Sequence, residues 1–306
     1  VPLLLLRLLG LRLADVCHNV FPYATAGQAA GLFRRSALDR FLYRRIYRRF
    51  ERVFVHFEDN RRGFLAAYGL PSERVTAIPH GNEAIFEELR DPAADEVALR
   101  TSLHLAPDEP VVLLFGTLSR YKGADLLLSA FARIAARLPQ ARLVFAGFPS
   151  ADFDLPAHQT LARELGIEDR VRWAPRYVES GEVAAWMALA SVAVFPYRTV
   201  YQSGALAVAQ TFGVPVVASA VGAMPEVIVN GESGLLVPPG DLEALAAALL
   251  RVLEDSHLAR RLGEGARRDA RERFAWDRIA RTILEAYGTV LAAEPRKTPE
   301  KVEVPR

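Results

Sequence analysis

Two cations and two glycines in the segment GTLSRYKG, residues 116–123, form a pattern that can bind a phosphate group. The segment follows the apolar run VVLLF and precedes the helical pattern ADLLLSAFARIAARL. Ligands of open α/β sheets gather at the carboxyl ends of strands, where glycines such as Gly116, here followed by Thr117, let the backbone approach a phosphate closely. Arg120 and Lys122 would stabilise the negative charge of a leaving diphosphate. The alternative is a turn with two solvated cations at the start of a helix.

A second candidate segment, YRTVYQSGALAVAQTFGVPVVAS, begins a small-residue helix near Gln202, after a strand that ends at Pro196. The free backbone N–H groups at the amino end of this helix, around Ser203 and Gly204, would form an anion site. Gln202 and Ser203 can also reach sugar hydroxyls. The alternative is that Ser203 only caps the helix and Gly204 only permits close packing.

The third segment, VGAMPEVIVNGESGLLVPPGD, places Glu226 after a turn at another strand end. A carboxylate there could accept hydrogen bonds from ribose or sugar hydroxyls, or it could be a first-turn acid that the helix dipole favours. We expect the strand ends from Gly116 to Glu226 to form one pocket, which Lys122, Ser203 and Glu226 line together.

Two histidines, His18 and His80, come directly after predicted strands and would face the space between two domains. A lone histidine is more often structural than catalytic, so both interpretations stay open at this point. The remaining histidines have no such context: His56, His104, His158 and His257.

The elements that must position these residues form an α/β pattern. From Val111 onward, short apolar runs alternate with stretches of helical period, which indicates βαβ units and a parallel sheet covered by helices on both faces. Residues 1–88 contain fewer units of the same kind and predict part of a second such domain. The polar, Pro- and Asp-rich residues 89–110 predict a linker, and the charged, Pro-rich residues 293–306 predict a disordered tail.

Composition sets further bounds. The chain has 306 residues, 51% of them hydrophobic, and a formal net charge of +2, which is enough apolar material for two domains. The single cysteine, Cys17, excludes an internal disulfide and makes a reducing cytoplasmic location the expectation. The apolar run at Val1 contains Arg7 and Arg12 and is too short to span a membrane; its abrupt start suggests a missing upstream portion. Neither GxGxxG nor GxxxxGK is present, which disfavours dehydrogenases and P-loop enzymes.

Taken together and in order, these segments resemble the family 4 (group 1) glycosyltransferases, and QSG at residues 202–204 is similar to a subgroup of them. The resemblance implies two Rossmann-like domains that face each other across a cleft (GT-B type), the first one incomplete. The segments that carry it are HN at His18, IPHGN ending at Asn82, GTLSRYKG, RLVFAG, VRWAPRY, FGVPVVAS, GAMPEVI, NGESGLLVPPGD and FAWDRIARTILEAYGTV.

By this resemblance, residues 111–275 bind a nucleotide-sugar donor, with Arg120 and Lys122 on its diphosphate. Arg176 and Tyr177 would bracket the nucleobase. His18 would face the transferred sugar from the other domain.

The resemblance also implies that His80 and Asn82 lie on the acceptor side, and that a helix over residues 276–292 crosses back to brace the amino-terminal domain. The acceptor would be a glycan or a lipid-linked acceptor, and the sugar would be transferred to it with retention of anomeric configuration. No metal and no cofactor are expected.

One departure concerns two glutamates, seven residues apart, that the family usually places around the second segment. Here the positions hold Val200 and Val208, and each lost carboxylate would weaken binding by roughly one to two orders of magnitude. Two alternatives therefore stay open: a nucleotide-sugar epimerase of the same architecture, and a catalytically inactive sugar-nucleotide-binding subunit.

The segment FRRSALDRFLYRRIYRRFER places eight arginines between Arg34 and Arg52. At helical spacing its aromatic and aliphatic residues form one face, which suits docking on an anionic membrane surface and a peripheral location on the inner face of the cell membrane. A domain helix with solvated arginines explains the pattern equally well. Nucleic-acid binding is disfavoured, because the basic residues are local and no nucleic-acid-binding motif accompanies them.

Overall fold

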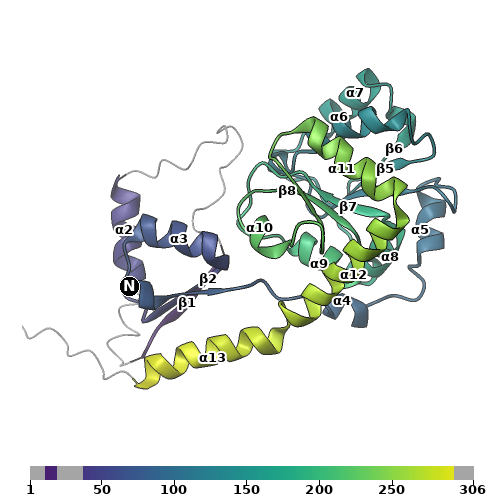
Figure 1. The fold of residues 1–306 in the computed structure, drawn as a ribbon. Helices are drawn as coiled ribbons and strands as arrows, with labels where there is room; N and C mark the ends of the chain where they lie inside the picture. Colours follow the sequence, from purple (N-terminus) through teal and green to yellow (C-terminus); the bar gives the residue numbers. More distant parts are fainter. Residues whose placement is uncertain (1–10, 19–36, 293–306) are drawn as a thin grey trace, which may run out of the picture.

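The computed structural model describes residues 11–18 and 37–292, which fold around two parallel sheets. The sheets belong to separate lobes, which a long helix joins along one side (Figure 1). Both sheets are covered by helices, which confirms the predicted α/β fold. No helix in the described part of the chain is long and apolar enough to cross a membrane.

The smaller sheet, in the amino-terminal lobe, has the order β1-β2-β3. Its strands are Ala14–Cys17 (β1), Arg52–His56 (β2) and Val75–Ile78 (β3). Because the strands are parallel, Cys17 pairs with Val55 and His56 pairs with Ile78, so the three carboxyl ends meet at one edge. Two helices flank this sheet, Ala37–Tyr47 (α2) and Phe57–Tyr68 (α3). Aromatic residues of these helices, Tyr47, Phe64 and Tyr68, pack against one another beside it.

The larger sheet has six strands in the order β6-β5-β4-β7-β8-β9. The strands are Val111–Phe115 (β4), Arg142–Ala146 (β5), Val171–Ala174 (β6), Val192–Phe195 (β7), Val216–Ser219 (β8) and Leu235–Val237 (β9). The chain runs from β4 outward through β5 and β6, then returns to place β7 on the other side of β4. This reversal between β4 and β7 is a topological switch point, the place where open α/β sheets bind ligands.

Helices cover both faces of the larger sheet, because alternate side chains of each buried strand point to opposite faces. Val112 and Leu114 of β4 pack in one core cluster, and Val111, Leu113 and Phe115 pack in the other. The first cluster includes Ala124–Ala135 (α6), Leu155–Glu164 (α7) and Leu242–Glu254 (α11). The second includes Val183–Leu189 (α8), Gly204–Phe212 (α9) and Met224–Val227 (α10). Ser256–Glu272 (α12) packs against α9 and α11.

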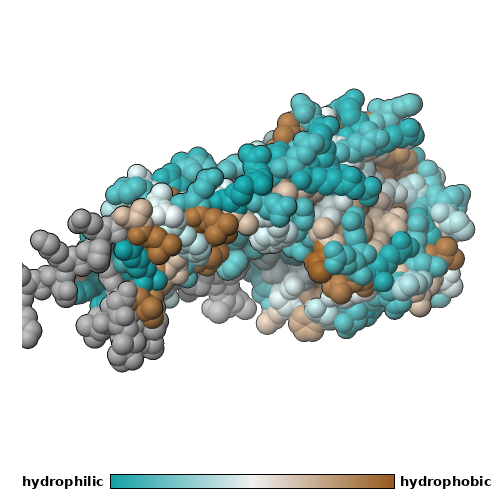
Figure 2. Space-filling view, turned by 90° about the horizontal axis from the view of Figure 1, so that it is seen from below, coloured by the Kyte–Doolittle hydropathy of each residue, from teal (hydrophilic) through white to brown (hydrophobic). Residues whose placement is uncertain are grey.

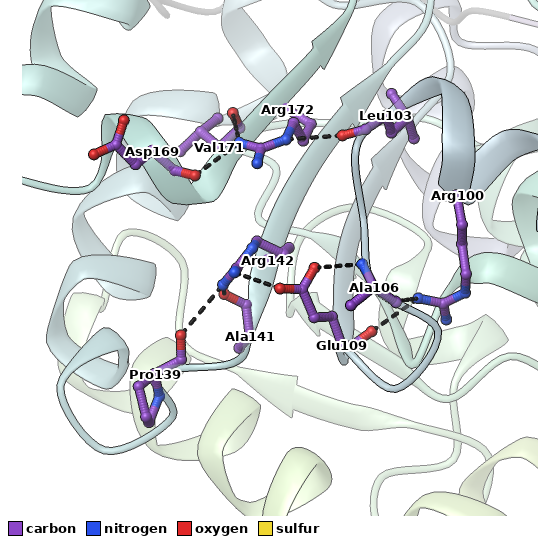
Figure 3. A network of polar contacts seen from close by, with 10 residues as sticks. All are labelled: Arg100, Leu103, Ala106, Glu109, Pro139, Ala141, Arg142, Asp169, Val171 and Arg172. Atoms are coloured by element: carbon purple, nitrogen blue, oxygen red, sulfur yellow. Dashed lines mark hydrogen bonds and ion pairs between the residues drawn. The ribbon is translucent and has the colours of Figure 1, made fainter.

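The segment 89–110, predicted as a linker, follows the short helix Ile85–Glu88 (α4) and itself contains the helix Glu96–Ser102 (α5). This helix packs on α8, and Leu103 and Leu105 join the core of the larger lobe. Glu109 forms an ion pair with Arg142 at the start of β5 and accepts a hydrogen bond from the N–H of Ala106 (Figure 3). Much of the predicted linker is therefore fastened to the amino ends of the strands, opposite the switch point.

The helix Trp276–Ala292 (α13) leaves the larger lobe and runs back along the smaller one (Figure 1). Its buried Ile279 and Ala286 pack against Phe54 and Ile78 of the smaller sheet. Leu284 and Leu291 of the same helix are exposed, and separate hydrophobic patches mark the lower face of the molecule, where α13 runs (Figure 2).

Candidate functional site

The loop 116–123 lies at the switch point and presents one buried cation. Lys122, in a single 3-10 turn over Arg120–Lys122, is 5% exposed. A Cβ added at Gly116 would lie 3.2 Å from Lys122 Nζ and 3.3 Å from the Cβ of Ala205, in the first turn of α9. The ammonium therefore lies beside the glycine and the amino end of α9. Burial lowers its pKa to about 8, so the site strongly favours a compensating negative charge.

Hydrogen bonds from neighbouring loops hold this segment in place. Ser119 Oγ donates to Asp152 Oδ1 at 2.8 Å, and Ser150 Oγ donates to the same oxygen at 2.5 Å. Arg198, after β7, forms an ion pair with Asp125 at 2.6 Å and donates to the carbonyl of Arg120. The side chain of Arg120 itself is exposed, which leaves it available to a bound anion.

The second predicted segment supplies a helix start beside Lys122. Ser203 is the N-cap of α9, and its Oγ accepts a hydrogen bond from the N–H of Leu206 at 3.2 Å. The first backbone N–H groups of a helix have no partner within it, so those at Gly204 and Ala205 carry the positive end of the helix dipole. Ser203 therefore caps the helix, as one interpretation predicted. The free N–H groups at the start of α9 also provide the geometry that an anion site requires.

A pocket between the two lobes adjoins this helix. Phe57 and His80 line it from the smaller lobe, and Gln202, Ser203 and Gln210 line it from the larger one. Gln210 is 1% exposed, and neither atom of its amide group has a hydrogen-bond partner among the described residues. The lining of this pocket holds Ser203 but neither Lys122 nor Glu226, so this pocket does not bring together the three residues that were expected to share one.

Glu226 lies at the contact between the lobes rather than beside Lys122. Its Oε2 accepts a hydrogen bond from the N–H of Glu58 at 2.9 Å, and its Oε1 accepts one from the N–H of Asp59 at 2.6 Å. These are first-turn amides of α3, so Glu226 caps a helix of the other lobe. Arg273 donates to the carbonyl of Glu226 at 2.6 Å and fixes the turn that carries it. In this arrangement both carboxylate oxygens are engaged, and a donor-binding role for Glu226 stays a prediction.

Known proteins are similar to this chain in sequence and in fold. Residues 109–255 match the family model described as "Glycosyl transferases group 1". A D-inositol 3-phosphate glycosyltransferase of Streptomyces bingchenggensis is 32% identical over 249 residues, which are 79% of this chain and 53% of that protein. One from Kribbella flavida is 33% identical over 254 residues, which are 80% of this chain and 58% of that protein. Residues 109–255 belong to the group 1 glycosyltransferases. The whole chain spans a little over half the length of these relatives.

Solved structures agree on the fold. A sucrose-phosphate synthase from Thermosynechococcus elongatus aligns with a TM-score of 0.73 and 28% identity, over 91% of this chain and 68% of that one. HepE of Anabaena, solved with UDP-glucose, aligns with a TM-score of 0.76 and 21% identity, over 94% of this chain and 75% of that one. The two lobes therefore form the GT-B arrangement expected of a group 1 glycosyltransferase.

Val200 and Val208 occupy positions where group 1 glycosyltransferases usually have glutamates. Each is 4% exposed, and both belong to the hydrophobic cluster that α9 forms on the larger sheet. A charge at either position would be costly in these surroundings, so the two valines are integrated into the core of this member. The polar side chains that remain near the start of α9 are those of Gln202 and Ser203.

His18, predicted to face the transferred sugar of a group 1 glycosyltransferase, directly follows β1 and is exposed. Its Nδ1 lies 2.9 Å from Nε2 of His56, the last residue of β2. Nothing in the local sequence around His56 marks it as a functional residue. The role of His18 towards a sugar stays a prediction.

The predicted acceptor-side residues connect the lobes. His80 lines the pocket and lies 3.9 Å from a carboxylate oxygen of Glu83. Oε1 of Glu83, a residue that no local sequence pattern marks, lies 3.8 Å from where a Cβ at Gly204 would be. Burial raises its pKa. The side chain of Asn82 donates to the carbonyl of Ala270, so Asn82 fastens this segment to α12, and its acceptor role stays a prediction.

Arg176 and Tyr177 follow β6, away from the buried cation. Arg176 forms a two-pronged ion pair with Glu182, with both N–O distances at 2.7 Å, and Tyr177 is exposed. Their contact with a nucleobase stays a prediction. In the described ranges, 11–18 and 37–292, no group of three or more His, Cys, Asp or Glu side chains is placed to hold a metal ion.

Proposed function

We propose that the chain is the donor-binding part of a retaining glycosyltransferase that moves a hexosyl unit from a nucleotide-sugar to a glycan or lipid-linked acceptor. The observation that carries the proposal is the position of Lys122 beside Gly116 and the amino end of α9. A buried ammonium, a glycine without a side chain and a helix amino end together suit a diphosphate.

In this reaction the bond between the anomeric carbon and the diphosphate oxygen breaks, and a bond to the acceptor oxygen forms on the same face of the sugar. The acceptor proton passes to the departing phosphate oxygen. Lys122, Arg120 and the helix dipole would stabilise the charge that develops on the diphosphate. The remaining task of the protein is to hold donor and acceptor in contact, to which His18, Gln202 and Ser203 contribute.

Calorimetric titration with UDP tests the diphosphate site directly. UDP is the first probe because HepE, a relative in fold, was solved with UDP and with UDP-glucose. We expect Lys122→Met to weaken binding by roughly one to two orders of magnitude, since a hydrogen bond to a charged group is worth about 1.5–3 kcal/mol. Arg133→Met, which removes an exposed cation of α6, is the control. Equal affinity of the parent and Lys122→Met would refute the assignment.

A second candidate function is an inactive sugar-nucleotide-binding subunit, which the burial of Val200 and Val208 favours. Turnover of a nucleotide-sugar in the presence of a panel of acceptors would exclude it. The same assay without acceptor separates a transferase from an epimerase, because only an epimerase would change the configuration of the free donor.

Contact with an anionic membrane is a separate part of the proposal. Phe41, Leu42 and Ile46 of α2 are exposed, as are Arg44 and Arg45. Aromatic and aliphatic side chains beside arginines suit the headgroup region of an anionic bilayer. Co-sedimentation with phosphatidylglycerol vesicles, and none with phosphatidylcholine vesicles, is the expected result. Replacing Phe41 and Ile46 with serine should abolish it.

A further inference from the structure

The amino-terminal lobe gathers three histidines at the carboxyl edge of its sheet. His18 directly follows β1, His56 ends β2, and His80 lies two residues beyond β3. The ring centroids of His18 and His56 are 5.0 Å apart, and those of His56 and His80 are 5.7 Å apart. The middle ring is therefore in contact range of both others, at the edge that faces the larger lobe.

The rings of His18 and His56 share a hydrogen bond. Nδ1 of His18 and Nε2 of His56 are 2.9 Å apart, so one nitrogen carries the proton and the other accepts it. Whichever ring donates, a neutral His18 is left with one defined tautomer. The bond engages Nδ1 and leaves Nε2, the distal nitrogen of the ring, for other partners.

The two rings differ in their surroundings. His56 is 6% exposed, whereas His18 is exposed to solvent. Burial, with further contributions from His80 and His18, lowers the pKa of His56 to about 4. His56 is thus a buried ring that is neutral at neutral pH, and His18 is the ring of the pair that a substrate can reach.

We propose that His56 is a positioning residue, which fixes the ring orientation and the tautomer of His18 through the hydrogen bond between their imidazoles. The consequence for catalysis rests on the proposed function, in which His18 faces the transferred sugar. The positioning itself does not depend on it. A functional histidine whose second nitrogen is held by a buried partner presents its free nitrogen in one state and one direction.

The backbone around His56 is itself fixed, which suits a positioning role. Asn60 Nδ2 donates to the carbonyl of His56 at 2.6 Å and to the carbonyl of Tyr201, in the larger lobe, at 2.9 Å. The next residue, Phe57, adopts a left-handed backbone with φ of +63° and packs against Phe274. These contacts anchor the turn after β2 to the larger lobe, so the His56 ring has a defined place relative to the candidate donor site.

The test is a long-range ¹H–¹⁵N spectrum of the histidine side chains in the chain labelled with ¹⁵N-histidine, at pH 7 and without ligand. The two ring nitrogens of a histidine in one tautomer have well-separated shifts, whereas a ring that exchanges between tautomers shows averaged ones. We expect His18 to show a single tautomer in the parent. An averaged pair of shifts for His18 would overturn the proposal without any variant.

Three variants sharpen the result. His56→Phe keeps a ring but removes the hydrogen bond, so the shifts of His18 should move to averaged values. His56→Gln places an amide near the position of Nε2 and should restore part of the separation. His158→Asn, on α7 of the larger lobe, removes a distant histidine that stacks on Phe153 and should leave His18 unchanged. If His56→Phe folds and His18 keeps its parent shifts, His56 does not position it. If His56→Phe fails to fold, the parent and His56→Gln spectra decide.

An activity measurement follows once a donor and an acceptor are known. Loss of an orienting hydrogen bond to a functional histidine costs roughly 10- to 100-fold at metal sites, and we expect a loss of this order in kcat with little change in the KM for donor. His56→Gln should recover part of it. If His18 shows a single tautomer but the chain has no transferase activity, the proposed function is refuted and the positioning of His18 by His56 still holds. The two failures are therefore distinguishable.

Discussion

The carboxylate of Glu226 in the larger lobe accepts a 2.6 Å hydrogen bond from the backbone N–H of Asp59 in the smaller lobe. With a second bond from the N–H of Glu58, it caps the first turn of α3 across the space between the lobes. A carboxylate at a helix amino end offsets the helix dipole and satisfies amides that have no partner within the helix. The two lobes are therefore connected by a polar contact at the edge where the histidines lie, in addition to α13.

Glu226→Gln should loosen the smaller lobe. A glutamine offers one acceptor oxygen and no charge, so we expect a loss of about 1–2 kcal/mol in the stability of the α3 amino end. Hydrogen exchange at the amides of Glu58 and Asp59 would measure it directly. Glu232→Gln is the matched control, because Glu232 lies in an exposed turn of the larger lobe, which also carries Glu226. It should leave both amides protected. Unchanged exchange in Glu226→Gln would show that solvent satisfies the turn equally well.

Lys122 should make the stability of the larger lobe depend on pH. Burial lowers its pKa from 10.5 to about 8, so between these values the unfolded chain binds more protons at this residue than the folded chain. The contribution of Lys122 to the free energy of unfolding therefore rises with pH through this window. Lys122→Met keeps a side chain of similar length that cannot titrate. In urea unfolding we expect the free energy of unfolding of the parent to rise by roughly 3 kcal/mol relative to that of the variant over this pH window. A difference between the two proteins that does not change with pH would contradict the lowered pKa.

Gln210 and Asn60 should respond oppositely to replacement with leucine. The Gln210 amide is buried and has no hydrogen-bond partner among the described residues, so its removal should stabilise the chain by about 1 kcal/mol. Asn60 is also buried, but it donates to the carbonyls of His56 and Tyr201. Its replacement removes one hydrogen bond from each of these carbonyls and should destabilise by about 2 kcal/mol. A destabilising Gln210→Leu would mean that a water or a ligand group in the pocket satisfies the amide in solution.

The strands of the larger sheet could be predicted from sequence because they are buried on both faces and read as continuous apolar runs, as VVLLF does. The strand Leu235–Val237 could not be predicted, because a run of three residues after Gly-Glu-Ser-Gly gives too little signal. The helix Glu96–Ser102 could not be predicted, because it lies among the polar residues of the predicted linker. It is stabilised by packing on α8, which the local sequence does not show.

Among the site residues, contacts within one short segment could be predicted from the sequence, and contacts between distant segments could not. Gly116 and Lys122 lie in one short segment, so local pattern was enough to bring them together. The partners of His18 and Glu226 come from distant parts of the chain: the His18–His56 bond spans 38 residues and the Glu226–Asp59 bond spans 167. No local pattern encodes such pairs. Only the parallel pairing of β1 with β2, and the docking of α3 on the larger lobe, determine them.

Gly123→Ala tests whether close packing at the switch point is essential. Gly123 has a φ of +71°, and a Cβ there would lie 2.2 Å from the carbonyl oxygen of Pro196, at the end of β7. Gly166 has a similar φ of +67° with no atom within 4 Å of its added Cβ, so Gly166→Ala is a matched control that carries the backbone penalty alone. That penalty is roughly 1–2 kcal/mol.

We expect Gly123→Ala to lose distinctly more stability in urea unfolding than Gly166→Ala, because the loop after β4 and the end of β7 must move apart to admit the methyl group. The displacement would also carry Lys122 away from Gly116 and the start of α9. UDP should therefore bind Gly123→Ala more weakly while its affinity for Gly166→Ala stays at the parent value. Equal losses of stability in the two variants would show that the loops accommodate the methyl group and that their close approach is not required.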